Sequence, residues 1–210
     1  MNKILFIITG SIAAYKCKEI ISLLNNQSFE ISCIVSREAK KYINLNELCK
    51  ITKNRIFTDE AEEKNKMLHI TLSRKNDLIV VCPATANSIA KFANGYGNNL
   101  ASNTLLASNK KIFLIPAMNI QMWLNKSNQK NVSIIKSRGH EFIGPEIGNL
   151  KCGEFGKGRI SNTKQIYQKI VKKRHFRMKK ANIGGGKQEN TPPFTKKPSF
   201  KRGKSAPIGG

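Results

Sequence analysis

The chain of 210 residues is long enough for one domain with a substantial hydrophobic core. Hydrophobic residues make up 40% of it, but no run approaches the roughly 18 apolar residues that span a bilayer. The first residues lack the long apolar stretch and the small-residue cleavage site of a signal peptide. We therefore expect a cytoplasmic protein that does not use a membrane as a partner.

The cysteine content argues against a disulfide framework and against a zinc site. The number of cysteines is odd, and no two of them form a CxxC pair. A free cysteine in a helix or strand acts as a small hydrophobe, whereas one in a polar loop is exposed to substrates. The five are Cys17, Cys33, Cys49, Cys82 and Cys152, and only the last lies in a glycine-rich polar segment.

Positive charge is concentrated at the carboxyl end of the sequence. Residues 172–210 hold 12 Lys or Arg against one acid, Glu189, and so carry +11 of the net charge of +24. This segment also contains several Pro and Gly and few large aliphatic residues, a composition that predicts a disordered basic tail over 176–210. A nucleic-acid-binding arm and a merely solvated tail remain open. The second is favoured because no RNA-binding motif accompanies the tail.

Short apolar runs alternate along the chain with amphipathic stretches. In chain order, the pattern predicts a strand at Lys3–Thr9, a helix at Ile12–Leu24, a strand at Phe29–Val35, a helix from Arg37 to about Tyr42, and a short helix with a loop within 44–65. There follow a strand at Asp77–Cys82, helices at Ala86–Phe92 and Leu100–Ala107, a strand at Lys111–Ile115, helical pieces within 120–136, a strand at His140–Ile143 and a helix at Ser161–Lys173. Apolar strands separated by helices predict one α/β domain over 1–175, with a doubly wound parallel sheet covered on both faces.

The first turn, Gly10-Ser11-Ile12, joins a predicted strand to a predicted helix. Ligands bind beyond the carboxyl ends of the strands in such sheets, and a helix start attracts phosphate. An ordinary turn in which Ser11 caps the helix is the interpretation that this segment alone favours. The run is not GxGxxG, which argues against a dinucleotide site.

Small polar groups also follow two later strands. Thr85, Ala86, Asn87 and Ser88 come after the third apolar strand, where they can hold a phosphate or a sugar hydroxyl or cap the next helix. Asn119 follows a strand as well, and by itself is most often a helix cap. His69 stands before a buried strand, a position that a structural histidine fills more often than a catalyst does.

Cys152 belongs to a run with three glycines and flanking charges, Lys151–Arg159. This composition predicts a mobile loop that exposes the thiol to a substrate. An incidental loop thiol remains the alternative interpretation.

The order of these signals carries more information than any one of them. Gly-Ser-Ile-Ala-Ala-Tyr-Lys at 10–16, His69, the Pro-Ala-Thr-Ala-Asn run at 83–87, the Pro-Ala-Met-Asn run at 116–119 and the cysteine run at 152–159 follow one another at the strand ends. This pattern resembles the flavin-containing cysteine decarboxylases, which include the phosphopantothenoylcysteine decarboxylases and the decarboxylase half of bacterial bifunctional coenzyme A biosynthesis flavoproteins. The resemblance covers residues 1 to about 172.

The resemblance implies a flavodoxin-like fold, FMN as cofactor, and a homo-oligomer, trimer or dodecamer, with active sites between subunits. It implies a separate synthetase chain for the preceding step. His69 and Cys152 would be catalytic, and Asn119, with Met122 near it, would bind the substrate carboxylate. The implied FMN contacts are Gly10, Ser11, Ile12, Ser36, Tyr42, Thr85, Ala86, Asn87, Ser88 and Ala117.

The implied reaction removes CO2 from 4′-phosphopantothenoylcysteine to give 4′-phosphopantetheine. The carbon bearing sulfur is first oxidised with the help of His69, CO2 then leaves, and the resulting enethiol is reduced while Cys152 donates a proton. Two other functions stay open. An FMN-dependent peptidyl-cysteine decarboxylase would stop at the enethiol and lacks a cysteine at the position of Cys152, which the resemblance places on a lid over the substrate. A non-catalytic flavoprotein regulator can lose active-site groups. The presence of His69, Asn119 and Cys152 favours the first reaction.

Overall fold

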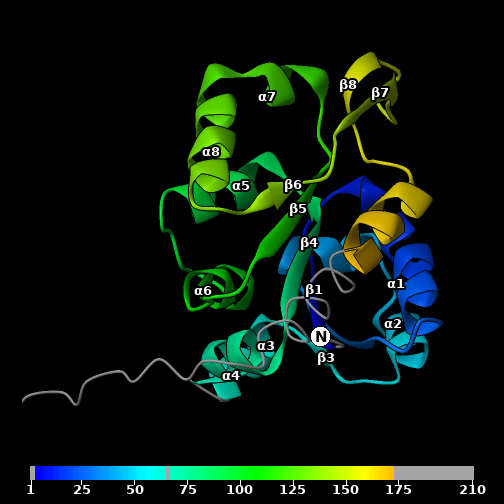
Figure 1. The fold of residues 1–210 in the computed structure, drawn as a ribbon, viewed down its shortest axis with the longest axis vertical. Coiled ribbons are helices and arrows are strands. Elements are labelled where there is room, and N and C mark those ends of the chain that lie inside the picture. The colour runs from blue at the N-terminus through cyan, green and yellow to red at the C-terminus, as the bar shows by residue number, and fades with distance from the viewer. Residues whose placement is uncertain (1–2, 65–66, 173–210) are drawn as a thin grey trace, which may run out of the picture.

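A six-stranded parallel sheet forms the centre of the molecule (Figure 1). The computed structural model describes residues 3–64 and 67–172. The strands are β1 (Lys3–Ile8), β2 (Glu30–Val35), β3 (Ile56–Phe57), β4 (Leu78–Ala84), β5 (Ile112–Pro116) and β6 (Glu141–Phe142), in the order β3-β2-β1-β4-β5-β6. Apart from the two-residue edge strand β3, this is the flavodoxin-like order, and the predicted doubly wound α/β fold is confirmed.

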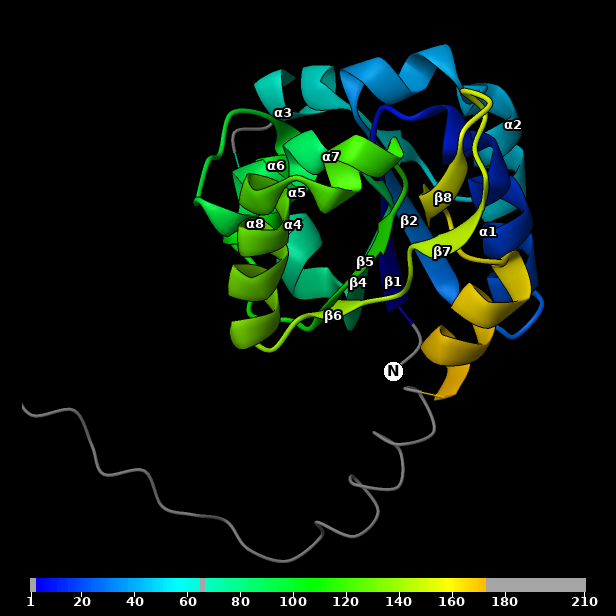
Figure 2. The same cartoon turned by 90° about the horizontal axis from the view of Figure 1, so that it is seen from above.

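Helices cover both faces of the sheet (Figure 2). One face carries η1 (Ile12–Lys16), α1 (Cys17–Asn25), α2 (Leu45–Thr52) and a final helix at 163–172, and the other carries α4 (Leu68–Lys75), α5 (Ala86–Ala93), α6 (Leu100–Leu106) and α8 (Lys126–Ser137). The remaining short helices are η2 (Arg37–Lys41), α3 (Asp59–Lys64) and α7 (Ile120–Leu124). None of the helices in the part of the chain that the structure describes is long and apolar enough to cross a membrane.

Strand β1 shows why the sequences of the buried strands are continuous apolar runs. Ile4 and Phe6 pack into the cluster on the α1 face, whereas Leu5 and Ile7 pack into the cluster on the α5 face, and all four are fully buried. Alternate side chains of a strand point to opposite faces, so a strand buried on both sides has no polar positions.

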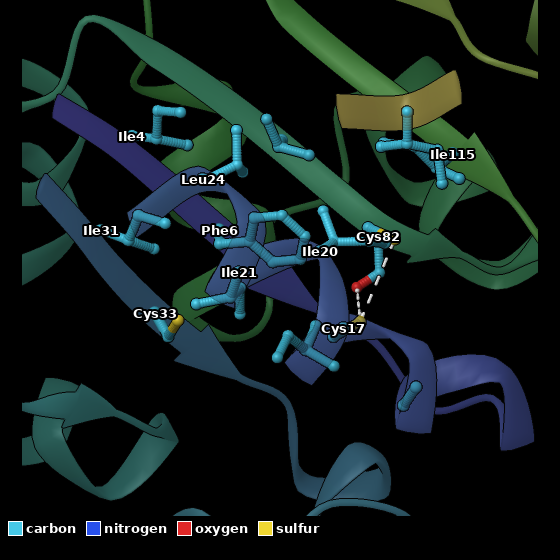
Figure 3. Packing of buried hydrophobic residues seen from close by; sticks show 14 of the residues in the cluster. Ile4, Phe6, Cys17, Ile20, Ile21, Leu24, Ile31, Cys33, Cys82 and Ile115 are labelled. Carbon is cyan, nitrogen blue, oxygen red and sulfur yellow. Dashed lines mark hydrogen bonds between the residues drawn. The ribbon is translucent and has the colours of Figure 1, made fainter. Parts of the chain in front are cut away.

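The α1 face of the core also holds buried thiols (Figure 3). The Cys17 thiol donates to the carbonyl oxygen of Cys82 at 3.0 Å. Burial raises the pKa of Cys17 and of Cys33, so both stay protonated and act as small apolar groups. Cys49, although it lies in α2, is exposed.

Several segments differ from the sequence-based expectation. Within 44–65 the structure has two helices, α2 and α3, and the edge strand β3 instead of one short helix and a loop. Residues 68–75, which contain His69, form helix α4, which the apolar pattern did not predict. The predicted mobile loop at 151–159 is wrong for its second half, since β8 (Phe155–Arg159) pairs antiparallel with β7 (Glu146–Asn149). The glycines that predict a loop here are instead the residues that let β8 pack closely. The predicted tail at 176–210 lies outside the described residues.

Candidate active site

A cavity of about 630 Å³ opens at the carboxyl edge of the sheet, where β1 and β4 are neighbours. This is the point where the chain order of the strands reverses, the place where doubly wound sheets bind ligands. Its size lies in the range of small-molecule and cofactor sites. The residues that line it and that the sequence predicted as cofactor contacts are Gly10, Ser11, Ser36, Thr85, Ala86, Asn87, Ser88 and Ala117.

The turn after β1 is shaped by one glycine and one hydroxyl. A Cβ atom at Gly10 would collide with the Cβ of Glu38, so only glycine lets this turn approach η2 so closely. The Ser11 hydroxyl accepts a hydrogen bond from the Ala13 N–H at 3.3 Å and so caps η1. A contact with Lys41 lowers the pKa of Glu38, which favours its ionised form.

The turn after β4 presents a second set of hydroxyls. Thr85 caps α5 by accepting from the Ser88 N–H at 3.2 Å, and the Ser88 hydroxyl donates to the Thr85 carbonyl at 2.8 Å. Hydroxyls placed at a helix start suit the oxygen atoms of a phosphate or a polyol. Capping and ligand binding, which the sequence left as alternatives, can therefore be served by the same residues.

A second cavity of about 560 Å³ adjoins the first and shares Ser11, Ala117 and Met118 with it. The hairpin β7–β8 and its turn form one side, with Asn149, Leu150, Lys151 and Cys152 in the lining. The Lys151 ammonium lies 5.8 Å from the centre of the Tyr15 ring, a cation–π contact that joins the hairpin turn to η1. The two cavities are therefore separated by a wall that they share, made of Ser11, Ala117 and Met118.

Close packing of glycines fixes the position of β8. The Met118 N–H donates to the Gly158 carbonyl at 3.1 Å. A Cβ at Gly158 would collide with the Met118 carbonyl oxygen, and one at Gly156 would come within 2.6 Å of the Ile120 side chain. The segment after β5 and the hairpin therefore meet only because Gly158 has no side chain, whereas at Gly156 the end of the Ile120 side chain can give way.

This docking brings Asn119 and Cys152 together through Glu154. Asn119 Nδ2 donates to Glu154 Oε2 at 2.6 Å, and the Cys152 thiol lies 3.6 Å from the same oxygen. Asn119 Oδ1 caps α7 by accepting the N–H groups of Gln121 and Met122, at 2.8 and 3.2 Å. Asn119 and Cys152 line the second cavity.

Four of the residues singled out from the sequence are placed differently. Ile12 lines the second cavity instead of the first, and Met122 lines the first. Tyr42 ends η2 and lies outside both cavities. His69, in the first turn of α4, lines neither cavity.

The structure adds residues to which the sequence assigned no role. Glu154 belongs to the glycine-rich run, and its spacing of two from Cys152 was the available signal. Asp59 lines the first cavity and its Oδ1 accepts the Leu100 N–H at 3.0 Å, a contact between α3 and α6 that no local pattern reveals.

The fold and the two adjoining cavities define a protein of the doubly wound α/β class that binds a cofactor at the strand ends. The family described as Flavoprotein matches residues 1–175. The chain belongs to the Flavoprotein family.

Curated relatives agree with this assignment. A probable phosphopantothenoylcysteine decarboxylase of Streptococcus mutans is 32% identical over 173 residues, which are 80% of this chain and 97% of that protein. The coenzyme A biosynthesis bifunctional protein CoaBC of Haemophilus influenzae is 38% identical over 162 residues, 76% of this chain. The chain spans only about 40% of the length of such bifunctional relatives.

Solved structures with the same fold include the FMN binding protein AtHal3, at a TM-score of 0.73 and 27% identity over 85% of this chain and 97% of that one. A PPC decarboxylase variant complexed with pantothenoylaminoethenethiol superposes at a TM-score of 0.75 with 27% identity, over 84% of this chain and 98% of that one. The peptidyl-cysteine decarboxylase EpiD superposes at 0.69 with 28% identity, over 80% and 98%.

Proposed function

We propose that this chain is an FMN-dependent decarboxylase that converts 4′-phosphopantothenoylcysteine into 4′-phosphopantetheine in coenzyme A biosynthesis. The observation that carries the proposal is the shared wall of the two cavities, Ser11, Ala117 and Met118, across which a cofactor and a cysteine conjugate would meet. The family, the named relatives and the FMN-binding structural neighbour support it.

The first cavity fits FMN by the chemistry of its lining. The hydroxyls of Ser11, Ser36, Thr85 and Ser88 and the amide of Asn87 suit a phosphate and a ribityl chain, and Ala86, Ala117 and Met118 offer an apolar surface to a ring. The close approach at Gly10 brings the turns after β1 and β2 to one side of this cradle. When bound, FMN supplies a two-electron acceptor for the carbon that bears sulfur.

Asn119 would hold the carboxylate that leaves as CO2. Its Oδ1 is engaged at the start of α7, so the group that would donate to a substrate carboxylate is Nδ2, which in this structure donates to Glu154. A neutral amide orients the carboxylate without the full positive charge that would stabilise the ground state too well. Met122, in the helix that Asn119 caps, lines the first cavity and would lie where the substrate meets the cofactor.

Cys152 would supply the proton that completes the saturated product, since it lines the second cavity on the hairpin turn. His69 would act in the oxidation that precedes loss of CO2. Because His69 lines neither cavity of this chain, we propose that a neighbouring copy in a cytoplasmic trimer, or a dodecamer built from trimers, brings it to the site.

The test is to purify the full chain with FMN and to give it 4′-phosphopantothenoylcysteine. We expect a flavin absorbance spectrum, release of CO2, and a product whose mass corresponds to loss of CO2 alone. A peptide ending in cysteine serves as the matched control substrate. Faster turnover of the peptide, ending at the enethiol, would reassign the protein to peptide modification.

We also propose that residues 1–175 form the whole catalytic domain and that the basic segment 176–210 is dispensable for catalysis. A chain truncated after residue 175 should bind FMN and turn over at the full-length rate. Loss of either would contradict this. RNA binding that weakens with salt and disappears on truncation would give the tail a separate role.

A further inference from the structure

The amide of Asn119 is held in one orientation by the helix that it caps. Turning the amide over would break both hydrogen bonds to its Oδ1, from the Gln121 and Met122 N–H groups. The Nδ2 group is therefore presented as a fixed donor at the edge of the second cavity. The chemistry that fits such a donor is a carboxylate.

A carboxylate of this chain already lies on that donor. Glu154 Oε2 accepts from Asn119 Nδ2 at 2.6 Å, and because the acceptor is a carboxylate this hydrogen bond is charge-assisted. The same oxygen lies 3.6 Å from the thiol of Cys152. One oxygen of Glu154 thus engages both groups to which the proposed reaction assigns a task.

We propose that Glu154 is an internal competitor for the substrate carboxylate: its side chain occupies the amide of Asn119, and the carboxylate of the cysteine conjugate displaces it and at the same time releases Cys152. The proposal rests on the decarboxylase function proposed above. Glu154 is a positioning residue in this scheme, since it acts through Asn119 and Cys152.

The surroundings of Glu154 allow such an exchange. Glu154 is exposed and lies at the end of the hairpin turn, next to Gly153, whose φ of 88° is in the region that favours glycine. A single charge-assisted hydrogen bond to a neutral partner favours the occupied arrangement by a factor of about ten to a hundred. An arriving carboxylate with further contacts in the cavity can overcome that factor.

The exchange separates substrate from product. The Nδ2 group has a second hydrogen, but a substrate carboxylate bound there would lie beside the negative charge of Glu154, and this repulsion makes the substrate displace Glu154. The decarboxylated product has no carboxylate and can bind while Glu154 stays on Asn119. Once CO2 has left, the carboxylate of Glu154 can return to the amide and carry Cys152 back with it. Glu154 would therefore weaken binding of the substrate but not of the product. It would also favour the conformation of the hairpin turn in which Cys152 faces the cavity.

The experiment uses two ligands that differ only in the carboxylate. One is 4′-phosphopantothenoylserine, which has the carboxylate but no sulfur to oxidise, and the other is its decarboxylated counterpart ending in ethanolamine. Calorimetry on the FMN-loaded full chain gives the two dissociation constants. Removing a competitor that fills the amide nine-tenths of the time should tighten binding of the serine ligand about tenfold in Glu154→Ala, and less in Glu154→Gln, which keeps an uncharged acceptor. Binding of the ethanolamine ligand should stay unchanged in both.

Two further variants make the outcome decisive. Glu146→Gln, on β7 of the same hairpin, removes an acid whose Oε1 accepts the Asn162 N–H at 3.1 Å, and should change neither constant. Asn119→Ala should weaken the serine ligand alone. If Asn119→Ala weakens it but the Glu154 variants bind it no more tightly than the native chain, the competitor is overturned and the decarboxylase function stands. If Asn119→Ala has no effect, the carboxylate site fails and the competitor fails with it.

Discussion

The two cavities at the carboxyl edge of the sheet are built in different ways. The first is formed by turns that follow β1, β2 and β4, strands whose apolar side chains are buried on both faces of the sheet. One side of the second cavity belongs to the same sheet and its covering helices, which together we call the body. The other side is the β7–β8 hairpin, on which Ile147 and Phe155 are 65% and 70% exposed. Residues that support the first cavity should therefore affect folding, whereas residues of the hairpin should affect catalysis while the body stays folded.

The largest effect is expected from truncating the core of the sheet whose strand ends form the first cavity. Phe6→Ala removes a fully buried ring from β1 and should lower the free energy of unfolding by about 3–5 kcal/mol, with loss of FMN binding at moderate temperature. The matched variant Phe155→Ala on β8 should change it by less than about 0.5 kcal/mol, because that ring is mostly exposed. Urea unfolding of both variants measures this. A similar loss for both would make the hairpin part of the cooperative core.

The second prediction assigns the body and the hairpin to different steps of the reaction. His69→Asn, on α4 of the body, should abolish CO2 release while FMN stays bound, because the oxidation that precedes loss of CO2 does not occur. Cys152→Ser, on the hairpin turn, should still release CO2 but should accumulate the enethiol, since a serine hydroxyl is a far weaker acid than a thiol. Mass spectrometry of a single anaerobic turnover distinguishes the two. Formation of the saturated product by Cys152→Ser at the native rate would show that another group is the acid.

A third prediction concerns the packing that holds the hairpin. Gly158→Ala places a Cβ against the backbone of Met118, which cannot move without shifting the wall between the cavities. Turnover should fall about a hundredfold with FMN still bound, the order of loss seen when reacting groups are misplaced by about an ångström. Gly156→Ala is the control, because its Cβ meets the end of the Ile120 side chain, which can rotate away. Equal losses in the two variants would mean that the docking of β8 is not what positions the turn.

The elements of the body could be predicted from the sequence more fully than the hairpin. The strands β1 and β4 were predictable because a strand buried on both faces leaves an unbroken apolar run, and the turns after them follow from the parallel sheet. Helix α4 was missed because its eight residues mix polar and apolar side chains with only Leu68, Leu72 and Ser73 buried. In the hairpin, Gly156 and Gly158 predict a loop locally, and the need for Gly158 in packing against Met118 appears only in three dimensions.

The residues of the candidate site were predictable only in the first cavity. Residues of the first cavity, such as Ser11 and Thr85, lie directly after predicted strands, so their convergence follows from the topology. The link between Asn119 and Cys152 depends on Glu154 and on the docking of β8 across 35 residues of sequence, and no local pattern contains it. The placement of His69 on α4, away from both cavities, likewise depends on tertiary structure.

The smallest predicted effect is a pH dependence of the free energy of unfolding that originates in the body and should leave ligand binding at the hairpin unchanged. His140 precedes β6 and lies against Phe92, with ring centres 5.1 Å apart, and its Nδ1 is buried without a hydrogen-bond partner among the described residues. Burial lowers the pKa of His140, and the charges of Arg138 and Lys111 lower it further. The native state therefore takes up this proton less readily than the unfolded state does, whose histidine has a pKa of about 6.5.

It follows that the free energy of unfolding is highest above that pKa and declines as the pH falls below it. Because the ring is only partly buried and solvent screens its charge, the slope should stay well under the limit of about 1.4 kcal/mol per pH unit for one proton. Urea unfolding at pH 7.5 and pH 5.5 measures the decline, and His140→Gln should flatten it. The exchange of Glu154 for a ligand carboxylate should be the same in His140→Gln as in the native chain. A change in ligand binding that followed the titration of His140 would show that the body and the hairpin are coupled after all.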